Sequence, residues 1–161
     1  MAEVPEADLT VIMGPGIAGG DLQNPPMGEL IRDSVEIVAT FQTMAGQGHL
    51  ARFQTLIDGE LNHCTELALP NSGGSGCGPE IPRFNVSFNS TQLDRGPLID
   101  GISIFGPPEV TAYEVDLGGI LVAIKPFNGA GYANWIGHGQ PVAINAHLQN
   151  GDIESVPFFA P

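Results

Sequence analysis

A chain of 161 residues with 42% apolar residues has the size and the apolar content of one folded domain, which argues against wholesale disorder. Asp and Glu outnumber Lys and Arg by 18 to 5, and a net charge of −13 repels the phosphates of nucleic acids and of anionic membranes. The richest apolar run, Ile120–Ile124, is far shorter than the ~18 residues that a membrane-spanning helix needs. We therefore expect no nucleic acid and no membrane as partner.

Residues 1–33 are predicted to form an irregular N-terminal arm. Short runs of glycine and proline interrupt it at residues 14–16, 19–20 and 25–26. A short turn of helix is predicted over residues 27–33, because Asn24 suits a helix cap and proline is favoured at the first helical position. The arm has little apolar material of its own, so either the chain's own sheet or a neighbouring subunit is expected to hold it. Pro25, Pro26 and Met27 are the predicted assembly contacts in this segment.

The composition also predicts where the protein works. Residues 1–10 hold three carboxylates, no Lys or Arg and no apolar stretch, which excludes a standard secretory signal peptide if Met1 is the native start. The 22 glycines and 14 prolines are nevertheless typical of a β-rich protein exposed at a surface. This combination indicates synthesis in the cytosol without a signal, followed by a place on a virion or an extracellular surface.

From residue 34 onward, short alternating runs of apolar and polar residues predict strands. In the run from Phe84 to Phe88, for example, Phe84, Val86 and Phe88 fall on one face. Nine strands are predicted, over residues 35–43, 49–57, 60–67, 84–88, 98–105, 109–117, 120–125, 141–148 and 153–159. Turn residues separate them, and Asp58-Gly59 and Gly118-Gly119 suit two-residue hairpins. The predicted fold class is therefore all-β, with an antiparallel β-sandwich or jelly-roll-like domain of about eight or nine short strands over residues 34–161.

Two cysteines bracket a segment rich in glycine. A bridge between Cys64 and Cys77 would close a short loop and contribute about 3 kcal/mol in the chain-entropy model. The proline and glycines between them can turn the chain back, so the geometry permits a bridge. Free thiols are the alternative if the chain stays in a reducing compartment.

One glycine-rich stretch between two predicted strands contains the single tryptophan. Tyr132, Asn134, Trp135 and His138 have the composition of a glycan- or partner-binding loop, in which an aromatic ring stacks on a sugar and amides bond its hydroxyls. The alternative is that Trp135 packs into the core or into a subunit interface.

No motif for metal binding or catalysis is present in the sequence. The four histidines lack the tight spacing of a zinc site. Asp94 and Asp100 in residues 94–101, and Asp152 in residues 150–154, are candidate Ca²⁺ ligands because they place oxygen atoms in loops. Neither of these two segments has EF-hand spacing. No G-x-S-x-G motif occurs, and no cysteine follows a strand-to-helix turn. We therefore predict no metal and no catalysis, with Ca²⁺ as the one cofactor to test.

The function that these features favour is structural. The C-terminal pair Phe158 and Phe159 would face opposite ways in a strand, so burying both requires a second cover, such as another subunit. The leading hypothesis is a virion structural protein, a capsid-decoration or tail or fibre component, that contacts its own copies or another virion protein. The alternatives are a carbohydrate- or receptor-binding β-sandwich module, and a subunit of a surface layer or extracellular filament.

Overall fold

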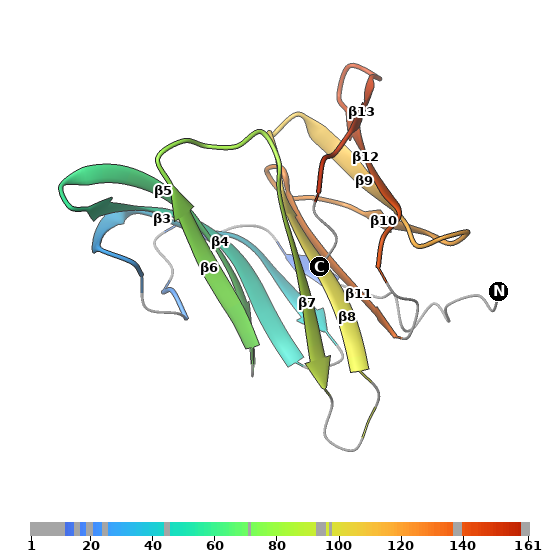
Figure 1. Cartoon of the computed structure of the whole chain (residues 1–161), viewed down its shortest axis with the longest axis horizontal. Coiled ribbons are helices and arrows are strands. Elements are labelled where there is room, and N and C mark those ends of the chain that lie inside the picture. The colour runs from blue at the N-terminus through green and yellow to red at the C-terminus, as the bar shows by residue number, and fades with distance from the viewer. Residues whose placement is uncertain are drawn as a thin grey trace. The chain divides into compact units, whose positions relative to one another are not determined.

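The computed structural model describes residues 12–14, 17–18, 21–23, 26–43, 46–70, 72–92, 96, 98–136 and 140–158. Within these ranges the chain forms thirteen strands and no helix, and every strand pairing is antiparallel (Figure 1). The prediction of an all-β, antiparallel chain is therefore confirmed.

The chain divides into two compact units, which we describe separately. One unit comprises Ile12–Pro82, and the other contains the described residues of Arg83–Pro161. The sequence had suggested a boundary between residues 33 and 34 instead. Strand β3 (Glu29–Thr43) spans that point, and it pairs with the next strand on both sides of it, with a register shift between Ile31 and Glu36.

The first unit is a six-stranded sheet in the order β1-β3-β4-β5-β6, with β2 also paired to β3. Its remaining strands are β1 (Ile12–Gly14), β2 (Ile17–Ala18), β4 (Gly46–Ile57), β5 (Glu60–Leu69) and β6 (Ser72–Gly78). Asp58 and Gly59 join β4 to β5 with φ angles of 52° and 80°. Two successive positive φ values are those of a type I′ hairpin turn, so this predicted turn is confirmed.

The arm predicted over residues 1–33 contains β1, β2 and the start of β3. The helical turn predicted over residues 27–33 is wrong, because Glu29 to Ile31 pair with Gln54 to Leu56 of β4. Pairing along a whole strand outweighs a local cap signal. The residue that would have capped that turn, Asn24, lies outside the described residues.

The second unit is a sandwich of two sheets. The four-stranded sheet has the order β10-β9-β12-β13, and the three-stranded sheet has the order β11-β8-β7. Their bounds are β7 (Asn85–Gln92), β8 (Leu98–Phe105), β9 (Val110–Asp116), β10 (Leu121–Ile124), β11 (Ala130–Ile136), β12 (Ala143–Leu148) and β13 (Ile153–Ser155).

The core of this sandwich draws on both sheets. Ile102 and Trp135 of the three-stranded sheet share one buried cluster with Val115 and Ile144 of the four-stranded sheet. Phe158 packs on the same cluster and meets the ring of Phe88 edge-on. The side chain of Phe158 therefore has its cover within its own unit.

Candidate assembly edge

Strand β6 forms one edge of the six-stranded sheet. Among the described strands it pairs with β5 alone (Figure 1). Its sequence, Ser-Gly-Gly-Ser-Gly-Cys-Gly, carries no charge, and residues 73–76 are exposed. Natural edge strands are usually blunted by charged side chains, proline or a bulge, because unpaired backbone groups invite another strand. β6 has neither a charge nor a proline to block a further strand, and no described strand pairs with its outer edge.

The direction of the backbone groups of β6 follows from one distance. Cys64 and Cys77 lie directly opposite each other in the β5–β6 register, and their Cα atoms are 4.1 Å apart. In an antiparallel ladder that short spacing belongs to the pairs that are not hydrogen-bonded to each other. The N–H and C=O groups of Gly73, Ser75 and Cys77 therefore point away from β5, whereas those of Gly74 and Gly76 point toward it.

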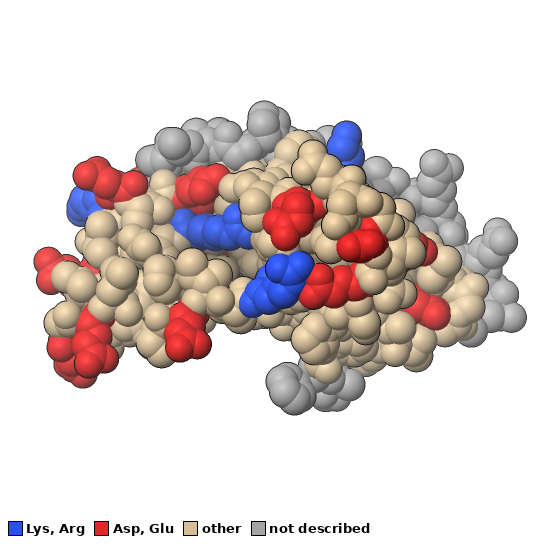
Figure 2. Space-filling model, turned by 90° about the horizontal axis from the view of Figure 1, so that it is seen from above, with Lys and Arg blue, Asp and Glu red and all other residues tan. Residues whose placement is uncertain are grey.

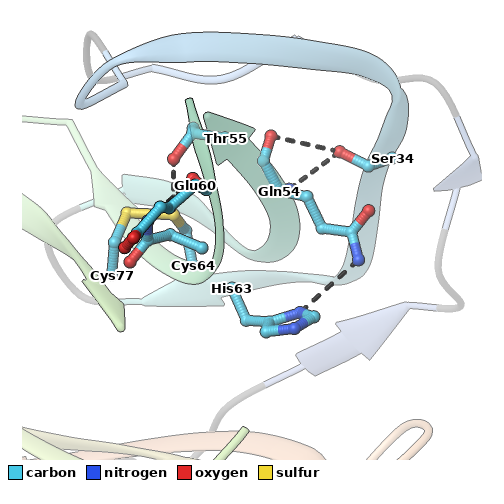
Figure 3. The surroundings of a disulfide bond; sticks show 8 residues. Ser34, Gln54, Thr55, Glu60, His63, Cys64 and Cys77 are labelled. Atoms are coloured by element: carbon cyan, nitrogen blue, oxygen red, sulfur yellow. Dashed lines mark hydrogen bonds between the residues drawn. A yellow bond between two sulfur atoms is a disulfide. The ribbon is translucent and has the colours of Figure 1, made fainter. Parts of the chain in front are cut away.

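A disulfide joins Cys64 of β5 to Cys77 of β6 (Figure 3). Cys64 is buried in a small apolar cluster with Val35 and Phe53, and Cys77 packs against that cluster. The hydroxyl of Thr55, on β4, lies 3.6 Å from Cys64 Sγ. A disulfide sulfur has no proton, so this hydroxyl is the donor.

Residues that precede β3 lie against this sheet. Leu22 packs on the cluster around Cys64. The Gln23 backbone N–H donates to Glu66 Oε2, and the Gln23 side-chain amide donates to the Leu69 carbonyl. Of the two covers expected for the arm, the chain's own sheet is thus the one observed for these residues.

A buried carboxylate holds this contact in place. Glu66 on β5 is only 1% exposed, and its Oε2 lies 2.6 Å from Nε2 of His49 on β4. His49 is half-buried at the surface end of the pair. A carboxylate this deeply buried needs such partners, because an unpaired buried charge is costly.

The residues of the predicted binding loop lie in a strand instead. Tyr132, Asn134 and Trp135 belong to β11 and are 2%, 1% and 1% exposed. Burial raises the pKa of Tyr132 to about 12, and its hydroxyl accepts a hydrogen bond from the Asn89 amide. The prediction of an exposed aromatic platform is wrong for these three residues, because no sugar can stack on a ring that neighbouring residues already cover. His138 lies outside the described residues.

The other predicted assembly contacts are only partly described. Met27 is 55% exposed and Pro26 is half-buried, while Phe158 packs into the sandwich core. Pro25 and Phe159 lie outside the described residues. Met27 is therefore the most accessible apolar side chain among these described positions.

Two of the three predicted calcium ligands are described, and each is bonded to a nearby polar side chain. Asp100 accepts a hydrogen bond from the Ser90 hydroxyl, and Asp152 is bonded to Asn150 in its own turn. Asp94 lies outside the described residues. Within the described ranges, no three His, Cys, Asp or Glu side chains gather closely enough to hold a metal ion. Nor does this part of the chain contain a helix with the length and apolar character needed to cross a membrane.

We compared the chain with known protein families, curated proteins and solved structures. No protein-family model, no curated protein and no solved structure matches the chain.

The sequence had suggested the disulfide but not the edge strand. The signal that could have located β6 was the cysteine pair itself: a bridge places Cys77 beside Cys64, and therefore beside a predicted strand. Glu66 and Thr55 have no sequence signal of this kind, because their roles depend on neighbours from other strands.

Proposed function

We propose that this protein is a structural subunit that assembles with a second copy of itself through the open edge of β6. The observation that carries the proposal is the uncharged backbone edge formed by Gly73, Ser75 and Cys77, of which Gly73 and Ser75 are exposed and Cys77 is half-buried. Main-chain hydrogen bonds across such an edge are an established way for sheets to join. The virion is the setting that the amino-acid composition favours for such a subunit.

The edge is self-complementary around Ser75. If two β6 strands lie antiparallel with Ser75 opposite Ser75 of the second copy, Gly73 of each copy faces Cys77 of the other. Each outward-pointing residue then exchanges both of its backbone hydrogen bonds with its counterpart. This arrangement has twofold symmetry, which is the commonest symmetry of homodimers.

Charge distribution also favours β6 as the meeting point. Figure 2 shows Asp and Glu side chains spread over the visible face, with fewer Lys and Arg side chains between them. Copies with a net charge of −13 repel each other over much of their surface. β6 has no charged residue, and its glycines and serines present no bulky side chain to an incoming strand. The junction is narrow, so we expect weak, concentration-dependent association with a dissociation constant in about the micromolar range or above.

The alternative of a carbohydrate-binding module receives less support. The three described residues proposed for it are buried, and two of them, Tyr132 and Asn134, face away from Trp135 along β11. The alternative of a filament subunit uses the same edge, but it requires a second surface to continue the chain of contacts.

The test is the molar mass in solution across a range of protein concentrations. Ser75→Pro removes an outward N–H while sparing the hydrogen bonds to β5, and the Ser75→Thr control keeps that N–H. We expect the wild type and Ser75→Thr to shift toward dimer as concentration rises, and Ser75→Pro to remain monomeric. Raising the salt concentration should strengthen the dimer, because salt screens the repulsion between copies. A wild type that stays monomeric at every concentration, or a Ser75→Pro variant that dimerises equally well, would refute the proposal.

A further inference from the structure

The two sulfurs of the Cys64–Cys77 bridge have different surroundings. Cys64 is 3% exposed, whereas Cys77 is half-buried on the edge strand. Cys64 Sγ also accepts a hydrogen bond from the Thr55 hydroxyl (Figure 3). An incoming thiolate can therefore reach the sulfur of Cys77 more readily than that of Cys64. The buried Thr55 hydroxyl is placed to donate to negative charge that develops on Cys64.

From this arrangement we infer that the Cys64–Cys77 bridge is a thiol–disulfide exchange site, attacked at Cys77 by small thiols, that controls whether β6 stays on the sheet. The inference concerns the order of β6 itself. Its consequence for assembly rests on the proposed function above.

β6 depends on this bridge because the rest of the strand has little to hold it. Four of its seven residues are glycine, which loses more conformational freedom on ordering than any other residue. A side chain built at Gly74 or at Gly76 would meet no atom within 4 Å, so neither position packs against anything in the described structure. Cys77 is the β6 residue that packs on the apolar cluster around Cys64. Breaking the bridge therefore removes the covalent link that keeps a poor strand-former beside β5.

Reduction of the bridge takes place in two successive substitutions at sulfur. The thiolate of a reductant attacks Cys77 Sγ, the bond between the two protein sulfurs breaks, and Cys64 leaves as a thiolate that then takes up a proton. The thiolate of a second reductant thiol attacks the reductant's sulfur in the mixed disulfide, and the bond from that sulfur to Cys77 Sγ breaks. Cys77 leaves as a thiolate that takes up a proton, and the oxidised reductant is released. Two electrons pass from the two reductant thiols to the bridge. Re-oxidation by a small disulfide runs the same steps in reverse.

In a reducing compartment β6 would then stay disordered and the copies of the chain would remain monomeric. In an oxidising compartment β6 would be ordered and could pair with β6 of a second copy. The cytosol keeps thiols reduced, whereas the extracellular space is oxidising and allows disulfides to persist.

The first measurement is made on the full oxidised chain treated with glutathione and quenched with an alkylating agent, with the adducts located by peptide mass spectrometry. We expect glutathione on Cys77 and the alkyl group on Cys64. Thr55→Val, which keeps the shape but loses the hydroxyl, should slow reduction by dithiothreitol about fivefold, the loss of roughly one net hydrogen bond. Glutathione found on Cys64, or an unchanged rate in Thr55→Val, would overturn the assigned direction of attack.

The second measurement follows β6 by amide hydrogen exchange. Gly74 and Gly76 donate to β5, so their exchange should accelerate roughly tenfold or more on reduction, and equally in a Cys64→Ala/Cys77→Ala variant. Unchanged exchange at these two amides refutes control of β6 by the bridge, whatever the molar mass does. Accelerated exchange with the same dimer content in both redox states supports the control of β6 and refutes assembly through this edge.

Discussion

His49 and Glu66 join β4 to β5 through a 2.6 Å contact between His49 Nε2 and Glu66 Oε2. The carboxylate is 1% exposed and also accepts the Gln23 backbone N–H. The pair thus connects the residues before β3 to the middle of the sheet.

The two partners should not be equally sensitive to mutation. His49→Ala leaves a buried carboxylate without its imidazole, so we expect a loss of about 3 kcal/mol in the free energy of unfolding. Glu66→Gln keeps an acceptor and removes the buried charge, so it should cost only about 1 kcal/mol. Urea unfolding followed by far-ultraviolet circular dichroism measures both values. A larger loss for Glu66→Gln than for His49→Ala would contradict this account.

Loss of the disulfide should weaken the sheet of the first unit. Cys64 and Cys77 are 13 positions apart, and in the chain-entropy model a loop of that length is worth about 3 kcal/mol. The Cys64→Ala/Cys77→Ala variant and the reduced wild type should lose similar amounts of stability relative to the oxidised wild type. Chemical unfolding of the three samples side by side tests this. Equal stability in all three would show that the bridge does not constrain the unfolded chain.

Trp135 should behave as a core residue rather than as a binding platform. It is 1% exposed and belongs to the sandwich core, so Trp135→Ala should cost about 4 kcal/mol. Val142, which is 64% exposed, provides the control, because Val142→Ala should change stability by less than about 0.5 kcal/mol. Thermal unfolding distinguishes the two variants. Similar melting temperatures for both variants would instead favour the hypothesis that Trp135 is part of a glycan-binding surface.

The Arg83–Glu154 pair gives a dependence on pH. Arg83 Nε and a terminal guanidinium nitrogen each donate to a Glu154 carboxylate oxygen at 2.7 Å. These hydrogen bonds, with the attraction between the charges, lower the pKa of Glu154. The pair therefore stabilises the fold above the ordinary pKa of a glutamate, and this stabilisation is lost as the pH falls through the lowered pKa.

Removal of the guanidinium tests the cause of that shift. In Arg83→Gln the pKa of Glu154 should rise toward its ordinary value, whereas Lys125→Gln should leave it unchanged. An NMR titration of the Glu154 side-chain carboxyl reports both. A Glu154 pKa that Arg83→Gln leaves in place would show that the guanidinium is not its cause.

The sequence predicted the strands that alternate on one buried face. The runs around Val86 and Ile144 became β7 and β12, and the Asp58-Gly59 hairpin formed as expected. β11 was missed because most of its side chains are buried on both faces, which removes the alternation, and because its glycine suggested a loop. β6 was missed for the opposite reason: glycine and serine have no apolar pattern to read.

The position of β6 at a sheet edge could not be predicted from the sequence, for a related physical reason. Whether a strand lies at the edge of a sheet depends on long-range pairing, and which of its amides face outward depends on register. The cysteine pair located one contact of β6, between Cys64 and Cys77. The direction of the Ser75 backbone groups required the spacing between those two Cα atoms.

The most direct test of assembly through β6 is the concentration dependence of its amide signals in NMR spectra of the oxidised chain. If the copies join through β6, the signals of the outward-pointing amides of Gly73, Ser75 and Cys77 shift, and these amides become protected from exchange as the dimer forms. Those of Gly74 and Gly76, already bonded to β5, should change little. A dimer that forms while the signals of Gly73, Ser75 and Cys77 stay constant would refute assembly through β6.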